Sequence, residues 1–155
     1  MPYVTIKNWP TSGPSPYRPY RVQILMDTAN NQYELTVPGG YTWTPISVFA
    51  QDLTTDIVSD QRVELRIQDA DRNIVFDSGA PNLHSNERHY ITWAKGLQPT
   101  DYDNGQLPPT HFITQSLIDV SLKPGWIIGT NRETIGGAAG NEWMAYLYYW
   151  EEIVK

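Results

Sequence analysis

The segment 143–150, WMAYLYYW, is the longest unbroken run of apolar and aromatic side chains in the sequence, and it decides the fold. Its spacing alone is ambiguous, because Trp143, Leu147 and Trp150 also fit one face of a helix. Its composition is more informative, since aromatic side chains favour strands and the preceding Gly-rich segment, 136–141, offers no strong helix cap. We therefore expect a strand.

Such a strand is apolar on both of its faces. Side chains alternate along a strand, so one face carries Met144, Tyr146, Tyr148 and Trp150, and the other carries Trp143, Ala145, Leu147 and Tyr149. A strand of this kind needs cover on both sides. One cover is an opposing sheet, and the other is an N-terminal arm, a long loop or another molecule.

The rest of the chain favours strands and turns as well. Six Trp, ten Tyr and twelve Pro stand against only 18% charged residues. The clearest alternation, QRVELRIQD at 61–69, directs Val63, Leu65 and Ile67 inward. Further strands are predicted at 20–27, 32–37, 42–53, 74–76, 88–93, 113–122 and 126–130. About eight to ten strands with regular turn signals predict an all-β sandwich or barrel.

Two Pro-Gly pairs predict turns at corners between sheets. In VPGG at 37–40 and in KPG at 123–125, the proline suits the second position of a type II turn. Gly39 and Gly125 would then adopt positive φ. Pro45 predicts an edge or a bulge near the start of its strand.

The chain divides into an extended arm at 1–19 and one β-sandwich domain at 20–155. Residues 8–19 hold four prolines, which prevent a helix or a strand ladder. Residues 95–109 lack an apolar period and predict a long loop suited to local function. We expect a soluble chain without a secretion signal, because no basic and apolar leader begins it and no run approaches about 18 apolar residues.

Charge and cysteine content narrow the chemistry. With 17 acidic and 11 basic side chains, the net charge of −6 disfavours a nucleic-acid partner. The sequence contains no cysteine, which excludes disulfides and thiolate chemistry. Membranes are not an expected partner either.

Two groups of residues invite a metal-site interpretation. Asp69, Asp71 and Asn73 are spaced like the start of a calcium loop, but Ile74 and Ala80 stand where glycine and a bidentate glutamate are needed, so a turn is expected.

The second group is His84, His89 and His111, with Glu87 nearby. These residues do not have metal-ligand spacing, and the sequence predicts surface histidines and no metal.

The sequence does not predict an enzyme or a cofactor. Glu151 and Glu152 are adjacent and would point to opposite faces of a strand, which does not suit a pair of carboxylates acting on one bond. The sequence holds no G-x-S-x-G motif.

The order of several segments is similar to that in a family of small tailed-phage and prophage virion proteins. These segments are VPGGYTWTPISVFAQDLTT, QRVELRIQDADRNIVF, RHYITWAKGL, LPP, SLIDVSLKPGWIIGT and GNEWMAYLYYWEE. The resemblance covers about residues 35–153 and leaves the arm unmatched. The chain departs from the family pattern at Lys123-Pro124-Gly125, where Pro-Pro-Gly is common, and in its unusually aromatic last strand.

The resemblance implies a jelly-roll-like antiparallel β-sandwich used as a capsid cement, or decoration, subunit. It implies binding to the major capsid protein, a position on the outer surface of the capsid, self-association as a homotrimer and no catalytic residues. The expected anchors are Tyr3, Trp9, Tyr17 and Tyr20 in and beside the arm, and Tyr146, Tyr148 and Trp150 in the last strand. The alternative is a carbohydrate- or receptor-binding module of a phage tail, with Trp93, Tyr102 and Trp126 as a sugar platform.

Overall fold

A computed structural model describes residues 20–25, 32–53, 60–80, 82, 84, 86–107, 109–135 and 142–154. Within these ranges the chain forms strands and no helix, so no helix that could span a membrane is found there. The strands are β1 (Tyr20–Leu25), β2 (Gln32–Thr36), β3 (Tyr41–Leu53), β4 (Asp60–Gln68), β5 (Ile74–Gly79), β6 (Arg88–Ala94), β7 (Thr100–Asp103), β8 (Thr110–Ser116), β9 (Ile127–Ile135) and β10 (Glu142–Ile153). The predicted arm, with Tyr3, Trp9 and Tyr17, lies outside the described residues.

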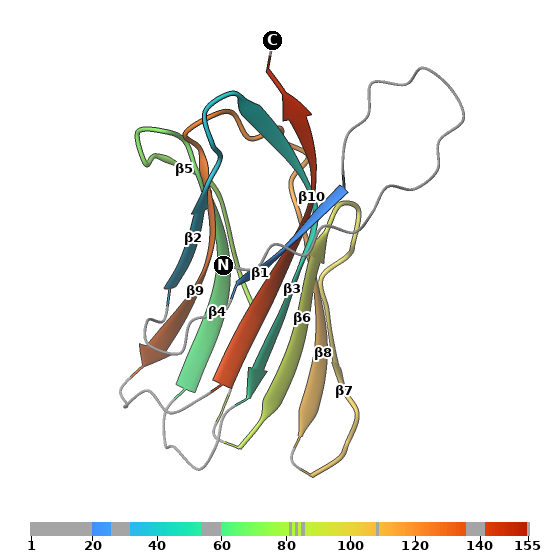
Figure 1. Cartoon of the computed structure of the whole chain (residues 1–155). Helices are drawn as coiled ribbons and strands as arrows, with labels where there is room; N and C mark the ends of the chain where they lie inside the picture. Colours follow the sequence, from blue (N-terminus) through green and yellow to red (C-terminus); the bar gives the residue numbers. More distant parts are fainter. Residues whose placement is uncertain are drawn as a thin grey trace, which may run out of the picture.

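The strands form two sheets that lie as two layers (Figure 1). One sheet has six strands in the order β1-β10-β3-β6-β8-β7, and the other has four in the order β2-β9-β4-β5. Among the described pairs, β6 and β8 run parallel and the others antiparallel. The expectation of purely antiparallel pairing is wrong at this one pair, because β7 forms the edge of the sheet and returns the chain to β8 beside β6.

The inner faces of the two sheets share one hydrophobic core. Val63, Leu65 and Ile67 of β4 are buried, which confirms their predicted inward direction. Ile91 and Trp93 of β6 belong to the same cluster from the other sheet. The all-β prediction is confirmed over the described residues, and a two-layered arrangement around one core agrees with a sandwich.

The segment 143–150 forms a strand, as its composition predicted. It belongs to β10, which lies inside the six-stranded sheet between β1 and β3. Ala145, Leu147 and Tyr149 are buried on its inner face. The ring of Tyr149 lies 4.4 Å from that of Trp43, centroid to centroid. The Trp43 Nε1–H donates a buried hydrogen bond of 3.0 Å to Glu151 Oε2. Ala145, Leu147 and Tyr149 belong to the same core as the inward side chains of β4, so the opposing sheet covers one face of this segment.

The two Pro-Gly turns both carry the chain between the sheets. The turn at 123–126 has the predicted form, with Gly125 at φ 83° and a 3.0 Å bond from Trp126 N to Lys123 O. In the other turn the prediction was wrong by one residue: Gly40, at φ 84°, takes the positive φ instead of Gly39. The reason is that the turn closes from Tyr41 N to Pro38 O, which moves the position of positive φ along by one residue.

Three other predictions concern strand limits. The pairing of β3 with β10 is irregular opposite Pro45, which confirms the predicted bulge. The predicted loop 95–109 contains strand β7, and the predicted strand 113–122 instead begins at Thr110 and ends at Ser116. A short strand without alternating apolar residues cannot be predicted from the sequence, because it forms only by pairing with a neighbouring strand.

We expect Leu65→Ala to lower the free energy of unfolding by about 2–5 kcal/mol, because it opens a cavity in the shared core. Leu65 is 0% exposed, whereas Ile74 at the start of β5 is 57% exposed and serves as the matched control. Ile74→Ala should change stability by less than about 0.5 kcal/mol. Urea denaturation followed by tryptophan fluorescence measures both, and equal effects of the two changes would contradict the shared core.

Candidate functional site

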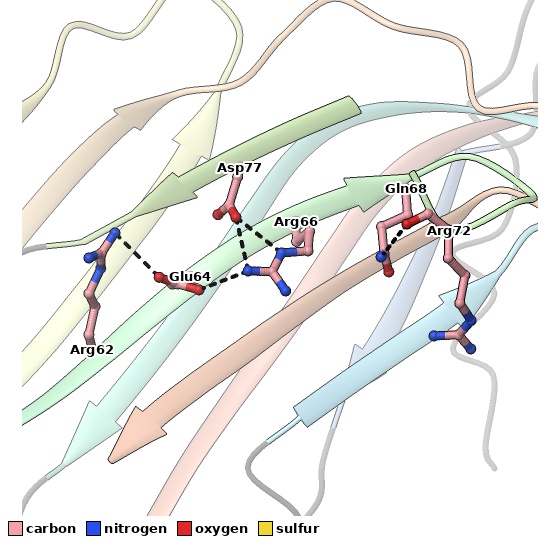
Figure 2. A network of polar contacts seen from close by, with 6 residues as sticks. All are labelled: Arg62, Glu64, Arg66, Gln68, Arg72 and Asp77. Atoms are coloured by element: carbon pink, nitrogen blue, oxygen red, sulfur yellow. Dashed lines mark hydrogen bonds and ion pairs between the residues drawn. The ribbon is translucent and has the colours of Figure 1, made fainter. Parts of the chain in front are cut away.

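The outer face of the four-stranded sheet carries a network of charged side chains (Figure 2). Glu64 lies between two arginines of β4, at 3.3 Å from Arg62 Nη2 and 3.3 Å from Arg66 Nη2. Arg66 also contacts Asp77 of β5 at 2.9 Å. Further along, Arg72 pairs with Glu34 at 3.3 Å. These oppositely charged groups pair with one another, and Glu64 at their centre is buried, so this face is polar and its charges are largely neutralised.

The outer face of the six-stranded sheet has the opposite character. On this face a row of five aromatic rings, one from each of five neighbouring strands, forms what we call the aromatic strip: Tyr146, Phe49, Tyr90, Phe112 and Tyr102. The order of these rings follows the order β10-β3-β6-β8-β7 of the strands. The strip therefore crosses most of the sheet.

The rings of the strip contact one another in sequence. Tyr90 and Phe112 stack with centroids 5.4 Å apart and planes inclined by 15°. Phe49 stacks on Tyr90 at 6.3 Å and 22°. The outer two contacts are tilted, between Phe49 and Tyr146 at 6.3 Å and between Phe112 and Tyr102 at 6.4 Å. Stacked neighbours cover part of each other's ring faces.

The strip becomes more exposed towards the edge of the sheet. Tyr146, Phe49 and Tyr90 are half-buried. Phe112 is 45% exposed and Tyr102 is 65% exposed. Trp150, also exposed, lies on the same face of β10 as Tyr146, as period two requires.

The structure separates the residues that the sequence analysis proposed as one sugar platform. Trp93 is 0% exposed and belongs to the core, so its ring is not on the surface. Trp126 packs partly buried against the same core. Tyr102 is exposed, but it joins the aromatic strip instead.

Of the expected interface residues, Tyr146, Tyr148 and Trp150 share the outer face of β10, with Tyr148 half-buried. Tyr20 begins β1 and pairs in register with Trp150. The other expected anchors lie outside the described ranges.

The sequence analysis did not single out Phe49, Tyr90 or Phe112. Their alternation with buried neighbours in β3 and β6 was a usable signal, since Ile91 and Trp93 point inward and Tyr90 must then point outward. What the sequence could not show was that the three strands lie side by side.

A cluster of polar residues lies on the inner face of the same sheet, at the end where β3 finishes and β6 and β8 begin. The strand register places Asp52, His89 and His111 in one row across β3, β6 and β8. His89 is 2% exposed. The expectation that the histidines are scattered surface residues is therefore wrong for His89, because the parallel pairing of β6 with β8 sets it against His111 with ring centroids 4.8 Å apart. His84, by contrast, is exposed.

Glu87 completes this cluster from the turn before β6. Its Oε2 lies 3.5 Å from His89 Nε2, and its Oε1 lies 4.0 Å from His111 Nε2. The backbone N–H of His84 donates to Glu87 Oε2 at 2.8 Å, which helps to fix the carboxylate. Asn86, directly before Glu87, adopts φ 58°, a conformation that asparagine tolerates better than most residues.

Asp101 of β7 supports the cluster from the other side. Its Oδ1 lies 2.8 Å from His111 Nδ1. Because a carboxylate only accepts hydrogen bonds when ionised, Nδ1 of His111 carries the proton in this contact. In a neutral imidazole the lone pair is then on Nε2, the atom that faces Glu87.

Burial lowers the pKa of His89 from its ordinary value of 6.5 to about 4, and the neighbouring His111 acts in the same direction. The carboxylates of Glu87 and Asp101 oppose this shift without overcoming it. His89 is therefore neutral at physiological pH.

The turn at 69–73 is a hairpin turn, as expected. Asp69 Oδ1 accepts bonds of 2.9 Å from the backbone N–H of Asp71 and of Asn73, and its Oδ2 accepts one of 2.9 Å from Asn73 Nδ2. These bonds, the Asn73 side chain foremost, lower the pKa of Asp69. Its carboxylate oxygens are thus engaged in shaping the turn.

Comparison with known proteins does not identify a function for this chain. No protein-family model matches the chain, and no curated protein is significantly similar to it.

We predict a loss of stability as the pH falls from about 6.5 to about 4, because the unfolded chain takes up a proton at position 89 over this range while the folded chain does not. His89 makes its full contribution to the free energy of unfolding above pH 6.5, and up to about 3 kcal/mol of that contribution is lost by pH 4. Glutamine at position 89 does not titrate. The unfolding free energy of the His89→Gln variant should therefore decrease less steeply as the pH falls. Urea denaturation at several pH values, with a chelator present, compares the two slopes, and equal slopes would rule out the buried neutral histidine.

Proposed function

We propose that this chain is a non-enzymatic structural subunit of a phage virion, a decoration (cement) protein that binds the outer surface of the capsid and bridges neighbouring copies of the major capsid protein. The aromatic strip is the observation that carries this proposal. A broad aromatic surface on the outer face of one sheet, with a self-neutralised polar face on the other sheet, is suited to protein contact.

The strand order supports the jelly-roll form of the sandwich. Consecutive strands β1 to β4 alternate between the two sheets, and the orders β1-β10-β3-β6 and β2-β9-β4-β5 correspond to one another strand for strand. Eight strands in two such sheets form a jelly roll, an architecture common in viral capsid proteins. In this assignment β7 and β8 extend one sheet at its edge. The jelly-roll assignment agrees with the family that the sequence resembles.

The exposed end of the strip is a suitable centre for an interface. Tyrosine and phenylalanine are enriched in protein contacts, and tyrosine is among the residues that most often contribute a large share of the binding energy. Burying the exposed parts of Phe112 and Tyr102 would contribute about 1–2 kcal/mol each. The charged network on the other sheet has its ion pairs already formed, so it gains little from a partner.

A sugar platform is less well supported by the same rings. A sugar stacks on the open face of an aromatic ring, but Tyr90, Phe49 and Phe112 stack on one another. Tyr102, at the end of the strip, has the most exposed ring of the five. Binding of a carbohydrate or a receptor is therefore the alternative that the labelling of particles, described below, would reveal.

The physical mechanism is mass action on a symmetric lattice. A subunit that binds the assembled shell and not the loose shell protein stabilises the shell. Each contact needs only about 800 Å² per partner, and the symmetry of the shell repeats it many times. Trimers at three-fold positions would let one subunit assembly engage several shell proteins at once, which raises avidity without new contacts.

Imaging of particles tests the proposal directly. An antibody against this chain, applied to purified particles of the phage or induced prophage that encodes it, should label the head at regularly repeated positions. Label confined to the tail tip would overturn the decoration role and favour the receptor-binding alternative. Particles without label would overturn a virion role altogether.

We expect Phe112→Ser combined with Tyr102→Ser to weaken binding to heads by about tenfold or more, since each change removes an exposed ring from the contact. The matched control is Ile74→Ser, which changes an exposed apolar side chain on the other sheet. Cosedimentation with heads depleted of the protein measures binding, and circular dichroism checks the fold. Equal binding by the double variant and the control would exclude the strip as the contact surface.

A further inference from the structure

We propose that Glu87, His89 and His111 form a binding site for one divalent transition-metal ion of the zinc class. The three side chains each offer a ligand atom, and these atoms all lie within 4.8 Å of one another. The site lies on the inner face of the six-stranded sheet, opposite the aromatic strip, so it does not depend on the proposed contact surface.

The ligand atoms lie somewhat further apart than they would around a bound ion. In a tetrahedral site with bonds of about 2.0–2.1 Å, ligand atoms lie about 3.3 Å apart. Here Glu87 Oε2 lies 3.5 Å from His89 Nε2, Glu87 Oε1 lies 4.0 Å from His111 Nε2, and the three ligand atoms lie within 4.8 Å of one another. Small side-chain rotations would bring the three atoms to bonding distance without moving a strand.

His89 provides the strongest indication that a ligand belongs here. Its Nε2 is buried and makes no hydrogen bond within the described part of the chain. Buried polar atoms in native proteins nearly always have a partner, and leaving one without costs about 1–3 kcal/mol. The atom points towards Glu87 and His111, and a metal ion among the three would satisfy it.

Groups around the cluster hydrogen-bond to its side chains and orient them, as second-sphere residues do around a metal site. Asp101 accepts from Nδ1 of His111 at 2.8 Å, which directs Nε2 of His111 into the cluster. The backbone N–H of His84 holds the Glu87 carboxylate from outside. A carboxylate–histidine–metal arrangement of this kind fixes both the tautomer and the direction of the imidazole.

The ligand set selects the class of ion. Two imidazoles and one carboxylate suit zinc and its first-row neighbours, whereas calcium and magnesium prefer oxygen ligands alone. Three protein ligands leave one tetrahedral position for water or another small ligand. His111 and Glu87 keep 19% and 15% of their side-chain surface exposed, so solvent reaches that position.

An ion bound at this end of β6 and β8 would stabilise the fold. Glu87 precedes β6, His89 lies within it and His111 lies in β8, so one ion would join the parallel pair and the turn that leads into it. An ion that binds the folded chain more tightly than the unfolded chain raises its stability. Because β6 and β8 run parallel, no tight hairpin can join them, and the chain reaches β8 by way of β7.

Zinc titration of the full-length, tag-free protein tests the site. After treatment with a chelator, isothermal titration with zinc chloride should show one equivalent bound and a rise in melting temperature that a chelator reverses. Glu87→Gln and His111→Gln should each weaken zinc binding at least tenfold. Both residues keep some exposure, so these variants are expected to fold even where a change at His89 does not.

His84→Gln is the matched control, since His84 is close in sequence and exposed, and its side chain is outside the cluster. It should bind zinc like the unchanged chain. Asp101→Asn should weaken binding about 10- to 100-fold as a positioning residue, while leaving one equivalent bound at saturation. Magnesium or calcium should not produce the stabilisation.

Three results would overturn the proposal. The first is that the unchanged chain takes up no zinc at an excess of about tenfold. The second is that His84→Gln weakens binding as much as His111→Gln does. The third is that Glu87→Gln and His111→Gln, both folded by circular dichroism, bind zinc like the unchanged chain.

Discussion

The burial of β10 inside the six-stranded sheet is the constraint on which the rest of the structure depends. Its inner side chains, Ala145, Leu147 and Tyr149, are buried, and its backbone pairs with β1 on one side and β3 on the other. Because β10 is apolar on both faces, the sheet that contains it must place an apolar layer against the opposite sheet and an aromatic surface on the outside. This one segment thus contributes Leu147 to the core and Tyr146 to the aromatic strip.

Local features of the fold were predictable from the sequence. The alternation in β4 placed Val63, Leu65 and Ile67 correctly, and the Lys123-Pro124-Gly125 turn has the predicted conformation, because period two and proline geometry act over a few residues. Gly40 in place of Gly39 shows the limit of this reasoning, since the turn closes from Tyr41 N to Pro38 O, one residue further along than the Pro-Gly pattern predicts. Strand β7 was missed for a related reason, as it exists only through its pairing with β8.

The candidate sites depend on strand neighbours, which the sequence does not show. His89 and His111 looked scattered because their strands are not consecutive, and their proximity follows from the parallel register of β6 and β8. The same register brings Tyr90 beside Phe112 on the opposite face. One pairing therefore assembles polar ligands inside and aromatic rings outside. Tyr102, named from the sequence for its aromatic character, is exposed as proposed but has different neighbours from those expected.

The free border of the six-stranded sheet at β7 has a consequence for how copies of this protein meet. This strand is only four residues long, TDYD, and its side chains Asp101 and Asp103 carry negative charge next to backbone groups that have no further strand beside them in the described fold. A short acidic border discourages another chain from adding to the sheet by strand-to-strand hydrogen bonding. Growth into open-ended fibrils by strand addition is therefore disfavoured at this border.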